Sequence, residues 1–397
     1  MEKKVIYFDN NATTRVDPRV FEAMRPFFCE RYGNASSIHT FGGSVMADVE
    51  AARCRVAELL GADFRDKDGR AAEILFTSGG TESDNAAIAA AAAVAPERRR
   101  IVVSRVEHPA ILTTVREYER RGYDVRQVPV DDRGRLDMAE LAATVNDDTA
   151  LVSLMWANNE IGNLYPVTEA AEIAHKHGAI FHTDAVQAVG KVPIDLASQP
   201  LDMLSLSGHK LHAPKGIGVL FIRRGVRFKP LVTGGHQERG RRGGTENVPG
   251  IVGLGEACRL AKAEMAEEVR RLAALRDRLE REVVQAIPRA FVNGDLEHRL
   301  PNTSSISFEG IEGEAILSLL DRHGICASSG SACTTGSLEP SHVLRAMGVP
   351  YTRAHGTLRF SLSKFNDESE IDELMKVLPG IIAALRRISP FWREDPA

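Results

Sequence analysis

The amino-acid sequence predicts an α/β protein with a mostly parallel seven-stranded sheet, covered by helices on both faces and followed by a smaller α/β domain. Two observations support this prediction. Seven short apolar runs alternate with helical patterns, and several runs are too apolar for a sheet with one wet face. Near residue 255 a long amphipathic helical pattern replaces that alternation. With 397 residues, 43% of them hydrophobic, the chain can bury a large core in two or three domains.

The predicted strands of the large sheet are short and mostly separated by helical segments. They occupy residues 73–77, 101–104, 125–130, 150–155, 179–183, 202–207 and 216–222. Parallel strands joined by helices bring their carboxyl ends to one edge of the sheet, which is where ligands bind in such folds. Residues that follow these strands are therefore the first candidates for a functional site.

The second domain is predicted from a different pattern. Apolar residues three or four apart indicate a helix that carries Met265, Val269, Leu272, Leu275, Leu279 and Val283. Alternating polar and apolar residues predict strands at 304–308 and 357–363. A closing helix is expected to bury Ile371, Leu374, Leu378, Ile381 and Leu385.

Charge and cysteine content exclude several classes of protein. A formal net charge of -4 gives no electrostatic reason to expect nucleic acid or an anionic membrane as partner. Five scattered cysteines without a C-x-x-C pair argue against a disulfide framework and a zinc ribbon, and favour a reducing cytoplasm. The N-terminal residues lack the apolar region of a signal peptide, and the Ala-rich run 86–95 is too short to span a bilayer, so we expect a soluble protein.

The first strand is followed by small residues that could hold a phosphate. Ser78-Gly79-Gly80-Thr81-Glu82-Ser83 precedes an Ala-rich helical run, so backbone N–H groups at a helix N-terminus could bind the anion. An ordinary Ser/Thr cap with a glycine turn is the alternative, and for this motif alone it is the more frequent structure.

A lysine follows the sixth strand beside hydroxyl and imidazole groups. Ser207-Gly208-His209-Lys210 fits a lysine that forms a Schiff base next to a bound phosphate. The alternative is a solvated surface lysine, which we expect for Lys215.

The fifth strand runs into Asp184, with Gln187 one turn further on. The aspartate could pair with a protonated pyridine nitrogen, and Gln187 could hydrogen-bond a phenolic oxygen of the same ring. The alternative for Asp184 is a helix N-cap. Because Asp184 and Lys210 both lie at ends of predicted strands of the same sheet, the functional interpretation is favoured.

Nine sequence blocks together resemble one family. In order they are FDNNATTR, FTSGGTESDN, VEHPA, NNEIG, HTDAVQAVGKVPID, SGHKLHAPKGIGVL, RRGGTEN, SSGSACTTGSLEPSHVLRAMG and LRFSLSKF. They run from residue 8 to residue 365, and together they resemble the NifS/IscS cysteine desulfurases, the NifS branch most of all.

The resemblance implies a fold, a cofactor and partners. The fold would be that of type I pyridoxal-phosphate (PLP) transferases, with a large domain at 15–258 and a small domain formed by 1–14 and 259–397. The activity would be conversion of L-cysteine to L-alanine, with the sulfur held as a persulfide on Cys333 for iron–sulfur cluster assembly, nitrogenase-type or housekeeping. The protein would be a homodimer that hands sulfur to a scaffold or other acceptor protein. A selenocysteine lyase or another type I PLP enzyme is the alternative.

The same resemblance implies roles for individual residues. Lys210 resembles the lysine that binds the cofactor covalently, and Cys333 resembles the nucleophile. His108 resembles the histidine stacked on the cofactor ring, while Asp184 and Gln187 resemble the partners of its nitrogen and phenolic oxygen. Asn159 and Arg359 resemble the residues that orient the substrate. The residues that resemble phosphate ligands are Gly80, Thr81, Ser207, His209 and, from the neighbouring subunit, Thr245.

No resident metal site is predicted. His182, His209 and His212 form no consistent ligand set, and hydrogen-bonded structural histidines are more frequent. The only contact with metal that we expect is a transient one between Cys333 and an iron–sulfur cluster. The sequence leaves open the sulfur acceptor, the choice between cysteine and selenocysteine, and the group that deprotonates Cys333.

Overall fold

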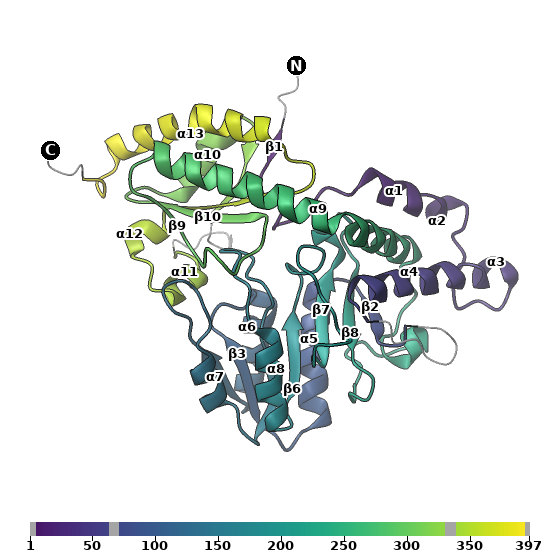
Figure 1. Cartoon of the computed structure of the whole chain (residues 1–397). Helices are drawn as coiled ribbons and strands as arrows, with labels where there is room; N and C mark the ends of the chain where they lie inside the picture. The colour runs from purple at the N-terminus through teal and green to yellow at the C-terminus, as the bar shows by residue number, and fades with distance from the viewer. Residues whose placement is uncertain (1–4, 63–70, 330–338, 394–397) are drawn as a thin grey trace.

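The computed structural model of the chain describes residues 5–62, 71–329 and 339–393. Figure 1 shows a large sheet flanked by helices and, above it, a smaller sheet with its own helices, with one long helix running through both parts. The elements of the large part position most of the predicted site, so they are described first.

The large sheet has seven strands, one for each predicted apolar run. They are β2 (Ile74–Thr77), β3 (Arg100–Ser104), β4 (Asp124–Val128), β5 (Thr149–Ser153), β6 (Ile180–Asp184), β7 (Met203–Ser207) and β8 (Gly218–Ile222). Their order across the sheet is β2-β8-β7-β6-β5-β3-β4. All neighbours are parallel except β8, which runs antiparallel to both β2 and β7. The predicted fold class is confirmed, with one reversed strand.

Except for the edge strand β4, the strands are buried on both faces, and their side chains alternate between two apolar clusters. In β3, Val102 packs into one cluster while Ile101 and Val103 pack into the other. Helices α5 (Gly80–Val94) and α6 (Pro109–Arg120) cover the second face. The first face is covered by α4 (Met46–Leu59), α7 (Met138–Thr144) and α8 (Val167–Lys176). This two-sided burial is why the runs read as continuously apolar.

Short helices complete this part. They are α1 (Pro18–Met24), α2 (Pro26–Cys29), α3 (Thr40–Gly43) and the 3₁₀ turns η1 (Gly208–Lys210) and η2 (Gln237–Gly240). Among them η1 matters most for the site, because it turns the chain directly after β7 and carries Lys210.

Helix α9 (Val248–Ala286) begins earlier than the predicted helix near residue 255. Its first turns contain Gly250, Gly253 and Gly255, which weaken a helical pattern in the sequence. The structure gives a reason for Gly255: a Cβ there would lie 2.6 Å from the Cα of Ala52 in α4. Close helix packing therefore accounts for a glycine that makes the sequence resemble a loop.

The smaller part contains a four-stranded antiparallel sheet and a two-stranded parallel one. The strands are β9 (Ala290–Val292), β10 (Thr303–Phe308), β12 (Ser328–Ser329) and β13 (Thr357–Ser361), in the order β12-β13-β10-β9, with β1 (Ile6–Tyr7) pairing with β11 (Ile325–Cys326). The helices are α10 (Gly313–Asp321), α11 (His342–Ala346), α12 (Tyr351–Ala354) and α13 (Glu368–Ile388). Both predicted strands and the closing helix are present. In β13 the alternation turns Leu358 and Phe360 into the apolar core, so Arg359 lies on the opposite face.

The two parts have separate apolar cores that α9 connects. Leu254 and Leu260 belong to the core of the large sheet, whereas Leu272 and Leu279 belong to the core of the small one. We propose that the domains divide within α9, in agreement with the expected domains 15–258 and 1–14 with 259–397. Across the described residues, no helix combines the length and the apolar character that a bilayer crossing requires.

Candidate active site

Four strand ends bring the predicted site residues to one edge of the large sheet. Asp184 is the last residue of β6, and Lys210 lies in η1 directly after β7. His108 follows β3 as the N-cap of α6, and Gly80 follows β2 as the first residue of α5. The prediction that residues after these strands meet at one edge is therefore confirmed.

Lys210 points its ammonium group at the N-terminal segment. Its Nζ donates to the carbonyl oxygens of Asn11 and, at 2.7 Å, of Ala12. Burial, followed by the positive charge of Arg359, lowers the pKa of Lys210 to about 8, while Asp184 opposes this shift. A substantial fraction of this lysine is therefore uncharged slightly above neutral pH, as a nucleophile or base requires.

Asp184 and His108 lie against each other in a buried environment. Ligand atoms of Asp184, His108 and Asp84 all lie within 4.8 Å of one another. Burial raises the pKa of Asp184, and the neighbouring His108 opposes this shift. Burial also lowers the pKa of His108. The alternative of a helix N-cap is wrong for Asp184, because Val186 N–H donates to its Oδ1 at 2.9 Å in a turn rather than in a helix.

Behind Asp184 lies a layer of buried polar side chains. His182 is hydrogen-bonded to the hydroxyls of Ser153 and Ser205, both at 2.9 Å. Burial lowers the pKa of His182 to about 3, so the imidazole is neutral at physiological pH. This agrees with the prediction of a structural histidine. Asp84 lies 3.7 Å from the His182 ring, and its buried Oδ1 has no hydrogen-bond partner among the described residues.

The N-terminus of α5 fits an anion. The N-cap is Gly79, and no side chain caps the helix, so the predicted alternative of an ordinary Ser/Thr cap is wrong. A Cβ on Gly80 would lie 2.8 Å from Val186 Cγ2 and 3.5 Å from Ser207 Cβ, which shows how closely the backbone is enclosed. The uncapped N–H groups and this narrow space suit the phosphate of PLP. The residues at the edge of the sheet therefore fit that cofactor.

The other predicted phosphate ligands lie around the same turn. Ser207 is buried at the end of β7, and Thr81 is exposed in the first turn of α5. The His209 ring is held by a hydrogen bond of 3.1 Å to the Thr13 hydroxyl. Burial and the positive charges of Lys210 and Lys215 lower the pKa of His209 to about 4, so the ring is neutral.

Gln187 is buried and hydrogen-bonded at both ends of its side-chain amide. Its Nε2 donates to the carbonyl oxygen of Asn11 at 2.9 Å, and its Oε1 accepts from Lys191 Nζ at 2.7 Å. The Asn11 carbonyl thus serves both Gln187 and Lys210.

Arg359 lies between the domains with part of its guanidinium group unused. One Nη donates to the Asn159 carbonyl at 3.0 Å, and the other donates to Asp9 at 2.7 Å. Its buried Nε has no partner among the described residues. The predicted pair Asn159 and Arg359 is therefore in contact, through the Asn159 backbone.

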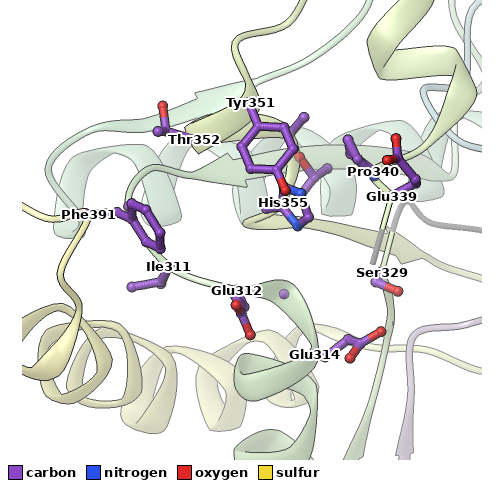
Figure 2. A pocket seen from close by; sticks show the side chains of 14 residues that line it. Ile311, Glu312, Glu314, Ser329, Glu339, Pro340, Tyr351, Thr352, His355 and Phe391 are labelled. Carbon is purple, nitrogen blue, oxygen red and sulfur yellow. The ribbon is translucent and has the colours of Figure 1, made fainter. Parts of the chain in front are cut away.

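Of the two remaining predicted residues, the structure describes only Thr245. Thr245 is exposed in the loop before α9 and lines a small pocket with Ser78, Gly216 and Arg242. Cys333 lies outside the described residues, so the structure does not place it. Figure 2 shows a surface pocket of about 200 Å³ that Ser329 and Glu339, the described residues on either side of the Cys333 segment, help to line together with Tyr351, His355 and Phe391.

Sequence reasoning missed five residues that contact the predicted site residues or interact with their charge: Asp9, Asn11, Asp84, Glu107 and Lys191. All five belong to blocks that carried the family resemblance. The available signal was a charged residue beside small apolar ones: Asp84 precedes the Ala-rich run of α5, separated from it by one residue, and Lys191 follows Ala188-Val189-Gly190. The carbonyl of Asn11 gave no signal, because every residue has one.

Comparison with known proteins assigns the family. A model for the aminotransferase class-V family matches residues 6–374, which contain every site residue that the structure describes, and the chain belongs to this family. Within it, the chain is similar to the cysteine desulfurase of Gluconacetobacter diazotrophicus, with 58% identity over 98% of this chain and 96% of that protein. It is also 56% identical to the cysteine desulfurase NifS of Azotobacter vinelandii, over 98% of this chain and 97% of that one.

Solved structures share the fold over nearly the whole chain. A NifS-like protein aligns with a TM-score of 0.89 and 41% identity, covering 96% of this chain and all of that one. The protein SspA, solved in complex with cysteine, aligns with a TM-score of 0.79 and 33% identity over 91% of this chain and all of that one. The predicted family is confirmed.

Proposed function

We propose that this protein is a PLP-dependent cysteine desulfurase that converts L-cysteine to L-alanine and carries the sulfur as a persulfide on Cys333. The observation that carries the proposal is the meeting of Lys210, Asp184 and His108 at one sheet edge. The chain around them is 58% identical to a cysteine desulfurase.

The residues at this edge would hold the cofactor by complementary contacts. Lys210 would bind it covalently, Asp184 would pair with its ring nitrogen, Gln187 would donate to its phenolic oxygen, and His108 would lie against its ring. The phosphate would be bound by Gly80, Thr81, Ser207 and His209. When bound, PLP supplies a sink for the electrons released at the substrate's Cα.

The chain's own groups would carry the proton and sulfur transfers. Lys210 Nζ, with its pKa lowered to about 8, would take the proton from Cα and return one to the carbon chain. The thiolate of Cys333 would attack the substrate's sulfur. As the new S–S bond forms, the Cβ–S bond breaks and its electrons leave with the carbon chain, which gains a proton and departs as alanine. His108 or the substrate would accept the proton of the Cys333 thiol.

Arg359 would orient the substrate through its carboxylate. A guanidinium group binds a carboxylate through two parallel hydrogen bonds, and Arg359 Nε is buried without a partner among the described residues. Substrate would compete with Asp9 for the Nη now paired at 2.7 Å. Asn159 would contact the substrate beside it.

The expected partners are a second copy of the chain and a sulfur acceptor. Thr245, exposed here, would reach the phosphate in the neighbouring subunit of a homodimer. The acceptor would be an iron–sulfur scaffold, of nitrogenase type because the relatives include a NifS. Four described cysteines are free thiols, which suits a reducing cytoplasm as the location.

The direct test is turnover of L-cysteine by the cofactor-loaded protein. We expect equal amounts of alanine and sulfide in the presence of a thiol reductant, and a persulfide on Cys333 by mass spectrometry in its absence. Cys333→Ser should still bind cysteine but form almost no alanine, whereas Cys29→Ser, at an exposed free thiol, should behave as wild type.

Other outcomes would point to other enzymes of the fold. Keto acid formed with transfer of the amino group would indicate an aminotransferase, and kcat/KM at least tenfold higher for selenocysteine would indicate a selenocysteine lyase. Alanine formation by Cys333→Ser near the wild-type rate would require another nucleophile. Mass spectrometry of proteins that gain sulfur in cell extract would identify the acceptor.

A further inference from the structure

We propose that Lys191 is a positioning residue that fixes the side-chain amide of Gln187, so that Gln187 keeps an N–H donor directed to the cofactor's phenolic oxygen. This inference rests on the proposed function, because it assigns a role toward PLP. Lys191 has no role in the cofactor contacts or in the proton and sulfur transfers proposed above.

The geometry is a chain of hydrogen bonds that leads to the cofactor lysine. Lys191 Nζ donates to Gln187 Oε1 at 2.7 Å. Gln187 Nε2 donates to the Asn11 carbonyl at 2.9 Å, and the same carbonyl accepts from Lys210 Nζ. Within the described residues, the only hydrogen bond of the Lys191 side chain is the one to Gln187.

Lys191 and the Asn11 carbonyl together allow one orientation of the amide. A carbonyl oxygen can only accept, so it must face the amide NH₂ of Gln187, and the Lys191 ammonium can only donate, so it must face the amide oxygen. Because the NH₂ group has two hydrogens, one remains for a ligand after Asn11 has been served. The buried amide therefore presents a donor and not an acceptor.

The contacts of the Gln187 amide with Lys191 and with the Asn11 carbonyl differ in how much they change during turnover. The Asn11 carbonyl also accepts from Lys210, whose bonding changes when it releases and regains the cofactor. Lys191 makes no other hydrogen bond among the described residues. Its contact with Gln187 Oε1 therefore holds the amide while the contact with the Asn11 carbonyl changes. This constancy is what makes Lys191 the positioning residue of the pair.

The surroundings of Lys191 favour this role over a solvated one. Its partly buried side chain lines a pocket of about 40 Å³, together with charged or titratable groups from neighbouring elements: Asp17, Lys210, His212, Glu268 and Lys364. Burial, followed by the charges of Lys210 and Arg359, lowers the pKa of Lys191 to about 7. Both the ammonium and the neutral amine carry N–H donors, so either form can serve Oε1.

The test is the visible absorption of the cofactor-loaded protein as a function of pH. Without a donor, the phenolic oxygen holds the proton of the neighbouring Schiff-base nitrogen more tightly. We therefore expect Lys191→Met to raise the midpoint pH of the absorption change by about half a unit to one unit, the effect of one hydrogen bond. Lys176→Met, at an exposed lysine of α8, should leave the midpoint unchanged.

A double-substitution cycle separates positioning from charge. Loss of the Lys191 charge also raises the midpoint, but it does so whether or not Gln187 is present. We expect the shift caused by Lys191→Met to be at least halved in a Gln187→Ala background; equal shifts in both backgrounds would overturn the proposal. Lys191→Gln, neutral but still a donor, should stay closer to wild type than Lys191→Met, and this variant serves as the test if Lys191→Met does not fold.

Different results would overturn the role of Lys191 and the proposed function. A wild-type protein that cannot acquire the visible absorption would overturn both. A wild type with the absorption and a Lys191→Met variant with an unchanged midpoint would overturn the inference alone.

Discussion

Lys210 has a lowered pKa and a side chain whose orientation is fixed by hydrogen bonds. Two main-chain carbonyls, of Asn11 and Ala12, accept its N–H bonds, while burial and Arg359 disfavour its charge. Carbonyl oxygens fix the orientation of the amine, but they stabilise its charged form less than a carboxylate would. The amine is thus held in place and is still able to lose its proton near neutral pH.

Replacement of this amine should separate folding from chemistry. We expect Lys210→Ala to remain folded, to lose the visible absorption of the bound cofactor, and to lose turnover by about 10³-fold or more, because it loses both covalent attachment and the base. Absorption spectra and alanine formation measure the two effects. Lys215→Ala is the matched control, since Lys215 is exposed five residues away. A yellow, active Lys210→Ala protein would contradict the assignment.

Glu107 gives a pH-dependent prediction. It is fully buried, its Oε1 accepts from Ser104 and Met155, and its Oε2 has no partner among the described residues. Burial raises its pKa from 4.5 to about 8. Between these values the folded protein holds a proton that the unfolded chain releases, so this group's contribution to stability falls as pH rises from 4.5 to 8.

Glu107→Gln removes this titration while keeping an oxygen acceptor. The free energy of unfolding of the variant relative to wild type should therefore rise with pH across that window, by up to about 1.4 kcal/mol per pH unit. Denaturant unfolding at several pH values between 5 and 8 measures it. Glu172→Gln, on the exposed face of α8, should show no such slope. A difference independent of pH would mean that Glu107 is ionised in the folded protein.

At the residue level, the sequence predicts side chains better than backbone groups. Strand-end reasoning placed Lys210 and Asp184 at one edge, and the family resemblance added His108. The structure brings the three together, while their catalytic roles stay predictions. Asn11 was missed because its contribution is a carbonyl oxygen. Residues of that kind become visible only when the fold shows which carbonyls face the site.

At the scale of one element, the N-terminus of α5 gives the clearest prediction. Gly80→Ala would place a methyl group 2.8 Å from Val186 Cγ2, so the turn that fits the phosphate must widen. We expect the affinity for PLP to fall by about ten- to a hundredfold, measured by reconstitution of the apo-protein.

A glycine elsewhere provides the control for this substitution. A methyl group on Gly380, exposed in α13, would meet nothing within 4 Å. Gly380→Ala should leave cofactor affinity unchanged and raise the free energy of unfolding by about 0.5–1 kcal/mol, because alanine favours the helix. Normal PLP binding by Gly80→Ala would show that the turn is not the phosphate site.

Helix α9 shows where element prediction fails and why. Its apolar spacing from Met265 onward was recognised, but its glycine-containing start was not. The penalty that glycine imposes on an isolated helix is offset here by close contact with α4, which the local sequence does not reveal. Tertiary packing therefore decides the helix boundary.

At the scale of the whole molecule, the alternation of apolar runs was sufficient for the fold class. Each of the seven runs forms a strand of the large sheet, and burial on both faces leaves a strong signal in all of them except the edge strand β4. The reversal of β8 was not predicted, since hydrophobic patterns carry no information on strand direction.

The proposed dimer is tested on the intact holoenzyme. We expect sedimentation to give twice the chain mass of 43.4 kDa, and activity per chain to fall on dilution below the dissociation constant, because Thr245 would serve the neighbouring site. Thr245→Ala should weaken cofactor binding. A monomer with full activity at high dilution would exclude a shared site.

The N-terminal segment ties the site to the order in which the ribosome makes the chain. Phe8 N–H donates to the carbonyl of Cys326, and Asn11 N–H donates to the hydroxyl of Ser361. The carbonyl that receives Lys210 is thus held by residues synthesised long after it, with Ser361 350 positions later in the chain. Contacts so distant in sequence form late, since the loop between them must close first. A nascent chain can therefore complete its large sheet while its lysine still lacks these acceptors, which are held in place only after Ser361 has been made.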